Sequence, residues 1–147
     1  MPKQAIAVAH LTADGIAGDR WNHPKIHGGP RKAVLLMTAE SLDEITNLGF
    51  PVFAGALGEN ITTRGLDRRE LRGGQRYSIG EAMIELTELR EPCRTLWRYG
   101  RSIGTTLYNR AARAGDPASY CWGLSGFYAA VLRAGVVKTG DPLTRLE

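Results

Sequence analysis

The sequence lacks several features that would assign it to a class at once. No apolar run approaches the roughly 18 to 20 residues that a membrane helix needs, and no apolar segment of a signal peptide follows the first residues. Only two cysteines occur among 147 residues, too few for an iron–sulfur cluster. These absences predict a cytoplasmic protein without membrane attachment, whose cysteines are free thiols and do not form a disulfide.

Glycine is abundant and basic residues are in slight excess. The 18 glycines indicate many turns and therefore favour β-structure over a helical bundle. Repeats, low-complexity tracts and linkers are missing, so residues 1–147 are predicted to form a single domain. The formal charge of +4 permits an anionic partner, but the arginines and lysines are scattered and do not form one basic tail or helix.

Hydrophobic patterning predicts mostly short strands. Predicted strands cover residues 5–9, 33–37, 77–79, 82–86 and 128–132, with a last pair of short strands near the end, and the first two are expected to be central. Thr38 caps a predicted helix over residues 39–48, and a second helix is predicted over residues 102–114. The pattern of many short strands with two helices predicts a mainly β fold, a barrel or a bent sheet.

Cys93 has the most informative surroundings of any residue in the sequence. It follows the rigid Pro92 at the end of a predicted strand, and Arg90 and Arg94 flank it with positive charges that favour a thiolate. A thiolate is a soft metal ligand and a strong nucleophile. Free cysteines are also often buried and inert, which is the interpretation for Cys121 between two aromatic residues. From the residues alone, both interpretations stay open for Cys93.

Two further segments carry candidate binding groups. A glycine pair after His27, with Arg20 before it and Lys32 after it, makes a loop that suits phosphate or another oxyanion, although such loops are also common as plain turns. In residues 58–66, Asn60 offers a donor and an acceptor for the edge of a heterocycle, and Arg64 offers a planar fork of donors. The alternative for this second segment is local hydrogen bonding to the backbone.

Taken together and in order, these segments resemble the MOSC domain family, which occurs at the carboxyl end of molybdenum-cofactor sulfurases and in free-standing relatives. The matching motifs are Gly18-Asp19-Arg20, His27-Gly28-Gly29 with Lys32-Ala33-Val34, Gly58-Glu59-Asn60-Ile61-Thr62-Thr63 with Gly65-Leu66, Arg90-Glu91-Pro92-Cys93, and Gly123-Leu124-Ser125-Gly126-Phe127-Tyr128 through Gly140-Asp141. The resemblance implies a mainly β fold, a strongly bent or closed β-barrel with two or three short helices, that binds the molybdenum cofactor, molybdopterin.

The resemblance also implies roles for individual residues. Cys93 would ligate molybdenum or carry sulfur toward it. The candidates for binding the cofactor are Arg20, Lys32, Asn60, Arg90 and Arg94. His27 is the candidate proton donor. The implied reaction is the reduction of N-hydroxylated compounds, with Cys93 as the molybdenum thiolate ligand. Because the chain shows no flavin or iron–sulfur signature, the electrons are expected from a separate reductase partner.

Two other functions remain open at this point. The first is a sulfur-carrier or cofactor-delivery module that uses a persulfide on Cys93; pyridoxal phosphate, used by full sulfurases, is not expected in a chain of this size with only four lysines. The second is a basic β-barrel that binds single-stranded nucleic acid, with Tyr77, Trp97 and Tyr99 as stacking surfaces.

Overall fold

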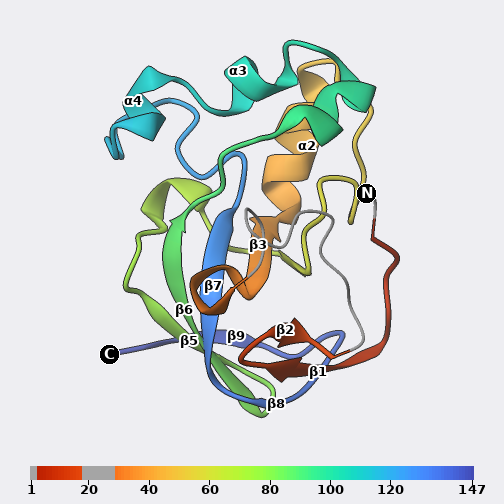
Figure 1. Cartoon of the computed structure of the whole chain (residues 1–147), viewed down its shortest axis with the longest axis vertical. Coiled ribbons are helices and arrows are strands. Elements are labelled where there is room, and N and C mark those ends of the chain that lie inside the picture. Colours follow the sequence, from red (N-terminus) through yellow and green to blue (C-terminus); the bar gives the residue numbers. More distant parts are fainter. Residues whose placement is uncertain (1–2, 18–28) are drawn as a thin grey trace.

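The computed structural model describes residues 3–17 and 29–147, and two sheets organise them (Figure 1). The larger sheet has the order β4-β3-β7-β6-β5-β9. Its strands are β3 (Val34–Thr38), β4 (Ile61–Thr63), β5 (Arg76–Ile79), β6 (Ala82–Leu89), β7 (Phe127–Arg133) and β9 (Leu143–Leu146). The smaller sheet has the order β2-β1-β8, with β1 (Val8–Thr12), β2 (Gly15–Ile16) and β8 (Gly135–Lys138).

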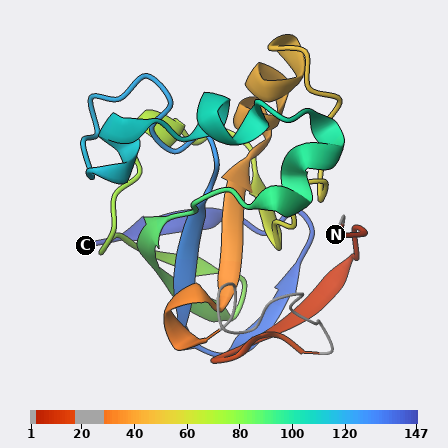
Figure 2. The same ribbon diagram turned by 45° about the horizontal axis from the view of Figure 1, so that its top comes forward.

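The six-stranded sheet curls into a half-barrel with helices at one end and the small sheet at the other (Figure 2). The helices are α2 (Ala39–Asn47), α3 (Ile103–Leu107) and α4 (Arg110–Arg113), and the 3-10 turns are η1 (Pro30–Lys32), η2 (Arg68–Glu70) and η3 (Arg94–Tyr99). This architecture confirms the mainly β, strongly bent fold with short helices. Within the described residues, no helix combines the length and the apolar character needed to cross a membrane.

The segment from β3 into α2 folds as its sequence predicts. All five residues of β3 are buried, because the strand lies inside the larger sheet and its side chains pack into both hydrophobic cores, Val34 and Leu36 into one and Met37 into the other. Thr38 ends the strand in an extended conformation, and its hydroxyl accepts a hydrogen bond from the Ser41 backbone N–H at 2.9 Å. This bond satisfies one of the free N–H groups at the start of the helix. The expected helix after Thr38 is therefore confirmed.

Two hydrophobic cores divide the molecule. The first lies within the strands and includes Leu36, Ile84 and Phe127, each 1% exposed or less. The second packs α2 against η3, α3 and the segment before β7, and includes Ile45 and Leu107. The Cys93 segment connects β6, which belongs to the first core, with η3, which belongs to the second.

Two predicted elements differ in the structure. The single helix expected over residues 102–114 is two short helices, because Tyr108 adopts an extended backbone and the Asn109 side chain then caps α4 by accepting from the Ala112 N–H at 2.8 Å. The strand expected over residues 5–9 begins only at Val8 and lies in the smaller sheet, where Val8 pairs with Lys138 of β8. Pairing with a distant strand, rather than local hydrophobicity, sets where β1 begins.

Candidate functional site

The segment that carries Cys93 leaves the end of β6 and is fixed there by backbone bonds. The Arg90 N–H donates to the Gly126 carbonyl at 2.9 Å, and the Ser125 hydroxyl donates to the Arg90 carbonyl at 2.6 Å. These two bonds join the end of β6 to the loop that precedes β7. Arg90 is therefore held in place from both sides before the chain reaches Pro92 and Cys93.

The Arg90 guanidinium is buried and only partly satisfied. The residue is 3% exposed, and its Nη2 donates to the Leu57 carbonyl at 3.0 Å. Its Nε and Nη1 atoms have no hydrogen-bond partner among the described residues. Burial lowers the pKa of Arg90, while nearby Tyr128, Cys93 and Glu59 act in the opposite direction. A buried guanidinium with two unused N–H directions favours a ligand that brings negative charge.

Cys93 lies next to this guanidinium and is half-buried, whereas Cys121 is buried. The Cys93 Sγ lies 2.8 Å from the Thr95 hydroxyl, a group able to donate to a thiolate. Its carbonyl accepts from the Leu96 N–H at 3.1 Å and so begins η3. The two thiols therefore differ in access, since Cys121 is 1% exposed, as expected for a buried cysteine between two aromatic residues.

Two residues of this site were not among the predicted site residues. Tyr128 is buried in β7, and the Lys32 Nζ lies 5.1 Å from the centroid of its ring. Burial raises the pKa of Tyr128, while the Arg90 charge opposes this shift. Glu59 is 3% exposed, and its Oε1 accepts from the Leu57 N–H at 3.1 Å, while its Oε2 has no partner among the described residues. Burial raises the pKa of Glu59, while hydrogen bonds from backbone N–H groups and the charge of Arg90 act to lower it.

Sequence signals for these two residues exist, but they are weak. Tyr128 and Glu59 both lie within motifs of the family resemblance, yet a glutamate beside glycine and asparagine is typically exposed. Tyr128 pairs with Glu88 of β6 and with Leu35 of β3, and its side chain lies on the face opposite to that of Phe127. The structure thus brings Lys32, Arg90 and Cys93 together around Tyr128, and adds Glu59 beside Arg90.

The other predicted site residues are placed differently. Asn60 forms two hydrogen bonds with β3. Its side-chain Oδ1 accepts from the Leu35 N–H at 2.8 Å, and its backbone N–H donates to the Leu35 carbonyl at 2.8 Å. Arg94 is exposed, and its guanidinium lies 5.6 Å from the centroid of the Trp97 ring. Arg20 and His27 lie outside the described residues.

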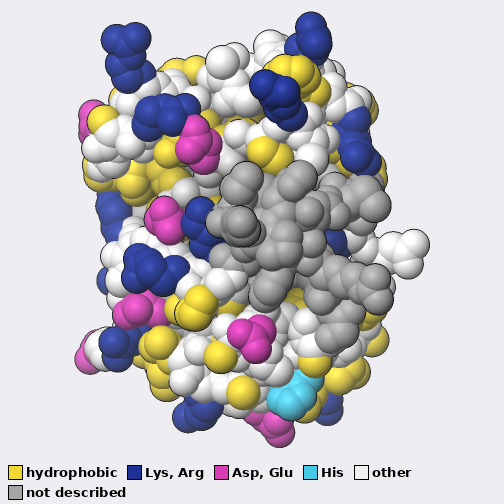
Figure 3. Space-filling view, viewed as in Figure 1, with side chains coloured by type: hydrophobic (Ala, Val, Ile, Leu, Met, Phe, Trp, Pro, Cys, Tyr) yellow, Lys and Arg dark blue, Asp and Glu magenta, His cyan; other side chains and the backbone are white. Residues whose placement is uncertain are grey.

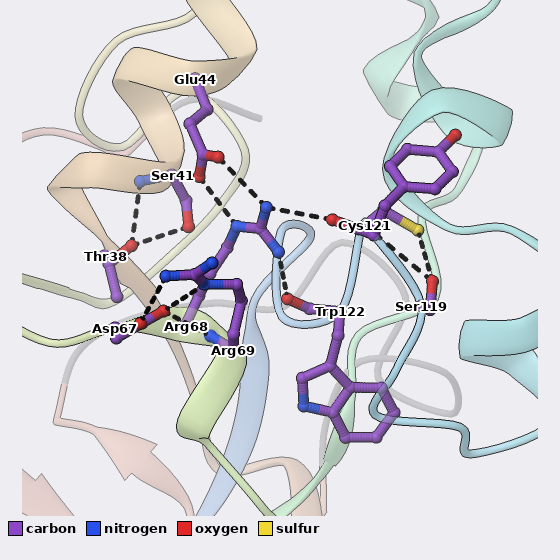
Figure 4. Close-up of polar contacts among 10 residues, drawn as sticks. Thr38, Ser41, Glu44, Asp67, Arg68, Arg69, Ser119, Cys121 and Trp122 are labelled. Carbon is purple, nitrogen blue, oxygen red and sulfur yellow. Dashed lines mark hydrogen bonds and ion pairs between the residues drawn. The ribbon is translucent and has the colours of Figure 1, made fainter.

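A second polar cluster surrounds Arg68, which is 8% exposed (Figure 4). Its guanidinium donates to both Glu44 carboxylate oxygens at 2.8 and 3.1 Å, and to the carbonyls of Trp122 and Tyr120 at 2.5 and 3.1 Å. The neighbouring Arg69 pairs with Asp67 and holds the pKa of that carboxyl at about 2. Because these charges are matched within the cluster, its arrangement suits a structural role that ties α2 to the loop before β7.

An open cavity of about 510 Å³ adjoins this second cluster. It is lined by Thr38, Glu40, Glu44, Gly65, Leu66, Asp67, Arg68 and Arg69. The residues predicted to bind a ligand do not line it, and the candidate site is therefore the group around Arg90 and Cys93, despite the size of this cavity. Within the part of the chain that the structure describes, no group of three or more His, Cys, Asp or Glu residues is arranged to hold a metal ion.

Comparison with known proteins identifies relatives of the chain in sequence and in fold. A family model described as MOSC domain matches residues 23–144. The uncharacterized protein YflK of Bacillus subtilis is 29% identical over 150 residues, which cover 100% of this chain and 62% of YflK. The protein YiiM of Escherichia coli is 34% identical over 90 residues, which cover 56% of this chain and 39% of YiiM.

Solved structures agree with the sequence matches. The crystal structure of YiiM from Escherichia coli has a TM-score of 0.70 and 25% sequence identity, and the match covers 99% of this chain and 65% of that chain. YiiM from Geobacillus stearothermophilus shares the fold, with a TM-score of 0.65 at 24% identity over 95% of this chain and 75% of that chain. The chain spans less than two thirds of the length of YflK and of Escherichia coli YiiM.

Proposed function

The chain belongs to the MOSC domain family, which is associated with binding of the molybdenum cofactor, and on that premise we propose that it binds this cofactor and reduces N-hydroxylated compounds. The observation that carries the proposal is the buried Arg90 guanidinium beside the half-buried Cys93 thiol. Two nitrogen atoms of the guanidinium, Nε and Nη1, have no hydrogen-bond acceptor among the described residues. An anionic ligand is the group that such a guanidinium lacks.

The residues present fit the cofactor in their chemistry. A molybdopterin carries a phosphate, for which the Arg90 guanidinium and the Lys32 ammonium are suitable donors. Cys93 would supply a thiolate to the metal, and thiolates are soft ligands that transition metals accept. Asn60 and Arg94 contribute less to this proposal, because the Asn60 side-chain oxygen accepts a hydrogen bond from the Leu35 N–H and the Arg94 guanidinium lies over the Trp97 ring.

The reaction breaks one N–O bond. An N-hydroxylated amine takes up two electrons and two protons, and it leaves as the amine and one water. When bound, the cofactor supplies the two-electron oxygen transfer. The protein would orient the ligand through Arg90 and Lys32 and deliver a proton, for which His27 is the proposed donor. Tyr128, whose pKa is raised by burial, is a neutral phenol beside Arg90.

The experiment compares the two cysteines. Wild type, Cys93→Ser and the control Cys121→Ser are produced in a host that makes the cofactor, and the purified proteins are assayed for molybdenum, for pterin and for reduction of a hydroxylamino-purine with reduced methyl viologen. We expect molybdenum in wild type and in Cys121→Ser, and its loss from Cys93→Ser. Wild type without molybdenum would refute the proposal.

The second candidate function, cofactor delivery or sulfur transfer through a Cys93 persulfide, is supported by the same partly accessible thiol. The experiment separates it from the first. Molybdenum bound without turnover, in a sample where viologen reduces a reference molybdenum enzyme, would favour delivery. Mass spectrometry of Cys93 would then show an added sulfur atom if the residue carries a persulfide.

A further inference from the structure

The excess of positive over negative charge in the chain comes from one stretch. Residues 92–115 contain five arginines and no Asp or Glu, while the whole chain has 19 Lys and Arg against 15 Asp and Glu. The remaining residues therefore carry 14 positive and 15 negative side chains, a net charge of −1. The five residues, here called the arginine surface, are Arg94, Arg98, Arg101, Arg110 and Arg113.

These arginines come from the helical end of the molecule and are all exposed. Figure 3 shows Lys and Arg side chains along that end. Arg113 pairs with Glu91 at 2.6 Å, whereas the other four form no ion pair with a described carboxylate. Arginines that form no ion pair create a positive electrostatic potential, which attracts and orients a negatively charged partner.

An aromatic anchor stands within the arginine surface. Trp97 is 42% exposed, and the guanidinium carbons of Arg94 and Arg101 lie 5.6 and 4.9 Å from its ring centroid. Phe53, 52% exposed, packs edge-on against Tyr99 with 6.3 Å between the ring centroids. Tryptophan and arginine are the residues that most often dominate the binding energy of protein interfaces, so this surface has both charge and an apolar contact.

We propose that the arginine surface, together with Trp97, docks an acidic electron-carrier protein. This inference rests on the proposed function, because it names the source of its electrons. The surface adjoins the candidate site, since η3 begins directly after Cys93. Each turnover needs two electrons, so two reduced one-electron carriers dock in succession and each is oxidised by one electron. The two electrons and two protons convert the N-hydroxylated amine to the amine and water.

The aromatic residues favour an acidic protein over single-stranded nucleic acid. Stacking of successive bases requires several exposed aromatic faces, and of the three candidate aromatics only Trp97 is exposed. Tyr77 is 4% exposed within β5, and Tyr99 is half-buried with its hydroxyl donating to the Ala56 carbonyl at 3.0 Å. The three aromatics therefore do not form a common stacking surface, whereas the arginines stay available to carboxylates.

The test uses matched charge reversals. Arg98→Glu/Arg101→Glu changes the arginine surface, and Arg133→Glu/Arg145→Glu makes the same change in net charge at exposed positions on β7 and β9. Binding to an acidic plant-type [2Fe–2S] ferredoxin is measured by calorimetry at about 20 and 500 mM salt, where screening differs strongly. We expect affinity at low salt to fall about tenfold or more for the first variant and to stay within about twofold for the control.

A kinetic arm separates this inference from the proposed function. Ferredoxin-driven reduction of a hydroxylamino-purine should fall in Arg98→Glu/Arg101→Glu, while the rate with reduced methyl viologen should stay at the wild-type value. Equal ferredoxin affinity in both variants, or tighter binding of a single-stranded oligonucleotide than of ferredoxin, would overturn the docking proposal. If neither reductant gives turnover in wild type, the proposed function fails, and the calorimetry alone decides whether the surface binds an acidic protein.

Discussion

Replacing Arg90 with methionine should stabilise the protein in the absence of a ligand. The wild-type guanidinium has two buried nitrogen atoms without a described partner, and each such group costs about 1–3 kcal/mol. The substitution removes both costs and fills the space with a flexible apolar side chain. It also leaves the Leu57 carbonyl without its donor, which costs about 1–3 kcal/mol.

The balance favours the variant by about 1–3 kcal/mol in the free energy of unfolding, in line with the effect of replacing buried ionic groups by apolar ones. For a domain of this size, that difference raises Tm by roughly 2–10 °C. Urea denaturation of ligand-free protein measures this difference, followed by tryptophan fluorescence, to which the buried Trp122 contributes. Arg90→Lys is the control, because it keeps a buried positive charge and should gain no stability.

The same variant should lose the ligand that the wild type binds. After production in a host that makes the molybdenum cofactor, Arg90→Met should contain less molybdenum and pterin than wild type although it is more stable. Stability gained together with binding lost is the signature of a residue kept for function. If Arg90→Met is less stable than wild type by more than about 1 kcal/mol and still binds the cofactor, the guanidinium has a structural role and the reasoning fails.

Three further predictions concern the folded chain. Arg68→Met should lower the free energy of unfolding by about 2–4 kcal/mol, because two carbonyls lose their donor, whereas the exposed Arg69→Met should change it by less than about 0.5 kcal/mol; equal effects in urea denaturation would contradict this. Gly123→Ala should cost at least about 2 kcal/mol more than Gly115→Ala in the same assay, since both residues have positive φ but only at Gly123 would a Cβ meet a carbonyl oxygen, at 2.6 Å. Burial raises the pKa of Glu59 in the folded state, so its contribution to the free energy of unfolding is complete below the ordinary pKa of 4.5 and is lost as pH rises through the raised pKa. Glu59→Gln should therefore gain stability relative to wild type from pH 4 to pH 8. A stability difference that stays constant with pH would refute the raised pKa of Glu59.

Local signals in the sequence predicted the elements that local interactions determine. Thr38 and the apolar period after it identify α2, and the hairpin of β5 and β6 follows from alternation around the Gly80 turn. The helix expected over residues 102–114 was wrong because one side chain, Asn109, starts a new helix within an otherwise helical pattern. The start of β1 depends on β8 near the other end of the chain, so no local signal could fix it.

The candidate site was predicted in part for the same reason. Arg90 and Cys93 are close in sequence, and the structure keeps them close in space. Tyr128 and Glu59 join them only because β7 pairs with β6 and because the loop before β4 packs under Arg90 through the Leu57 carbonyl. Arg94 directly follows Cys93 and is closer to it in sequence than Arg90 is, but the Arg94 side chain lies over Trp97 of η3. Sequence neighbours thus identify the thiol, whereas tertiary pairing identifies its buried partners.

The two hydrogen bonds between Asn60 and Leu35 have a consequence for the alignment of β4. A parallel strand held by three residue pairs has little to prevent it from sliding, and a slip of one residue would exchange its two faces. Because the Asn60 side chain and backbone both engage Leu35, only one offset satisfies the two bonds together. The same offset places Glu59 in the interior beside Arg90. Loss of activity on changing Asn60 would therefore report a shifted strand, even if Asn60 never touches a ligand.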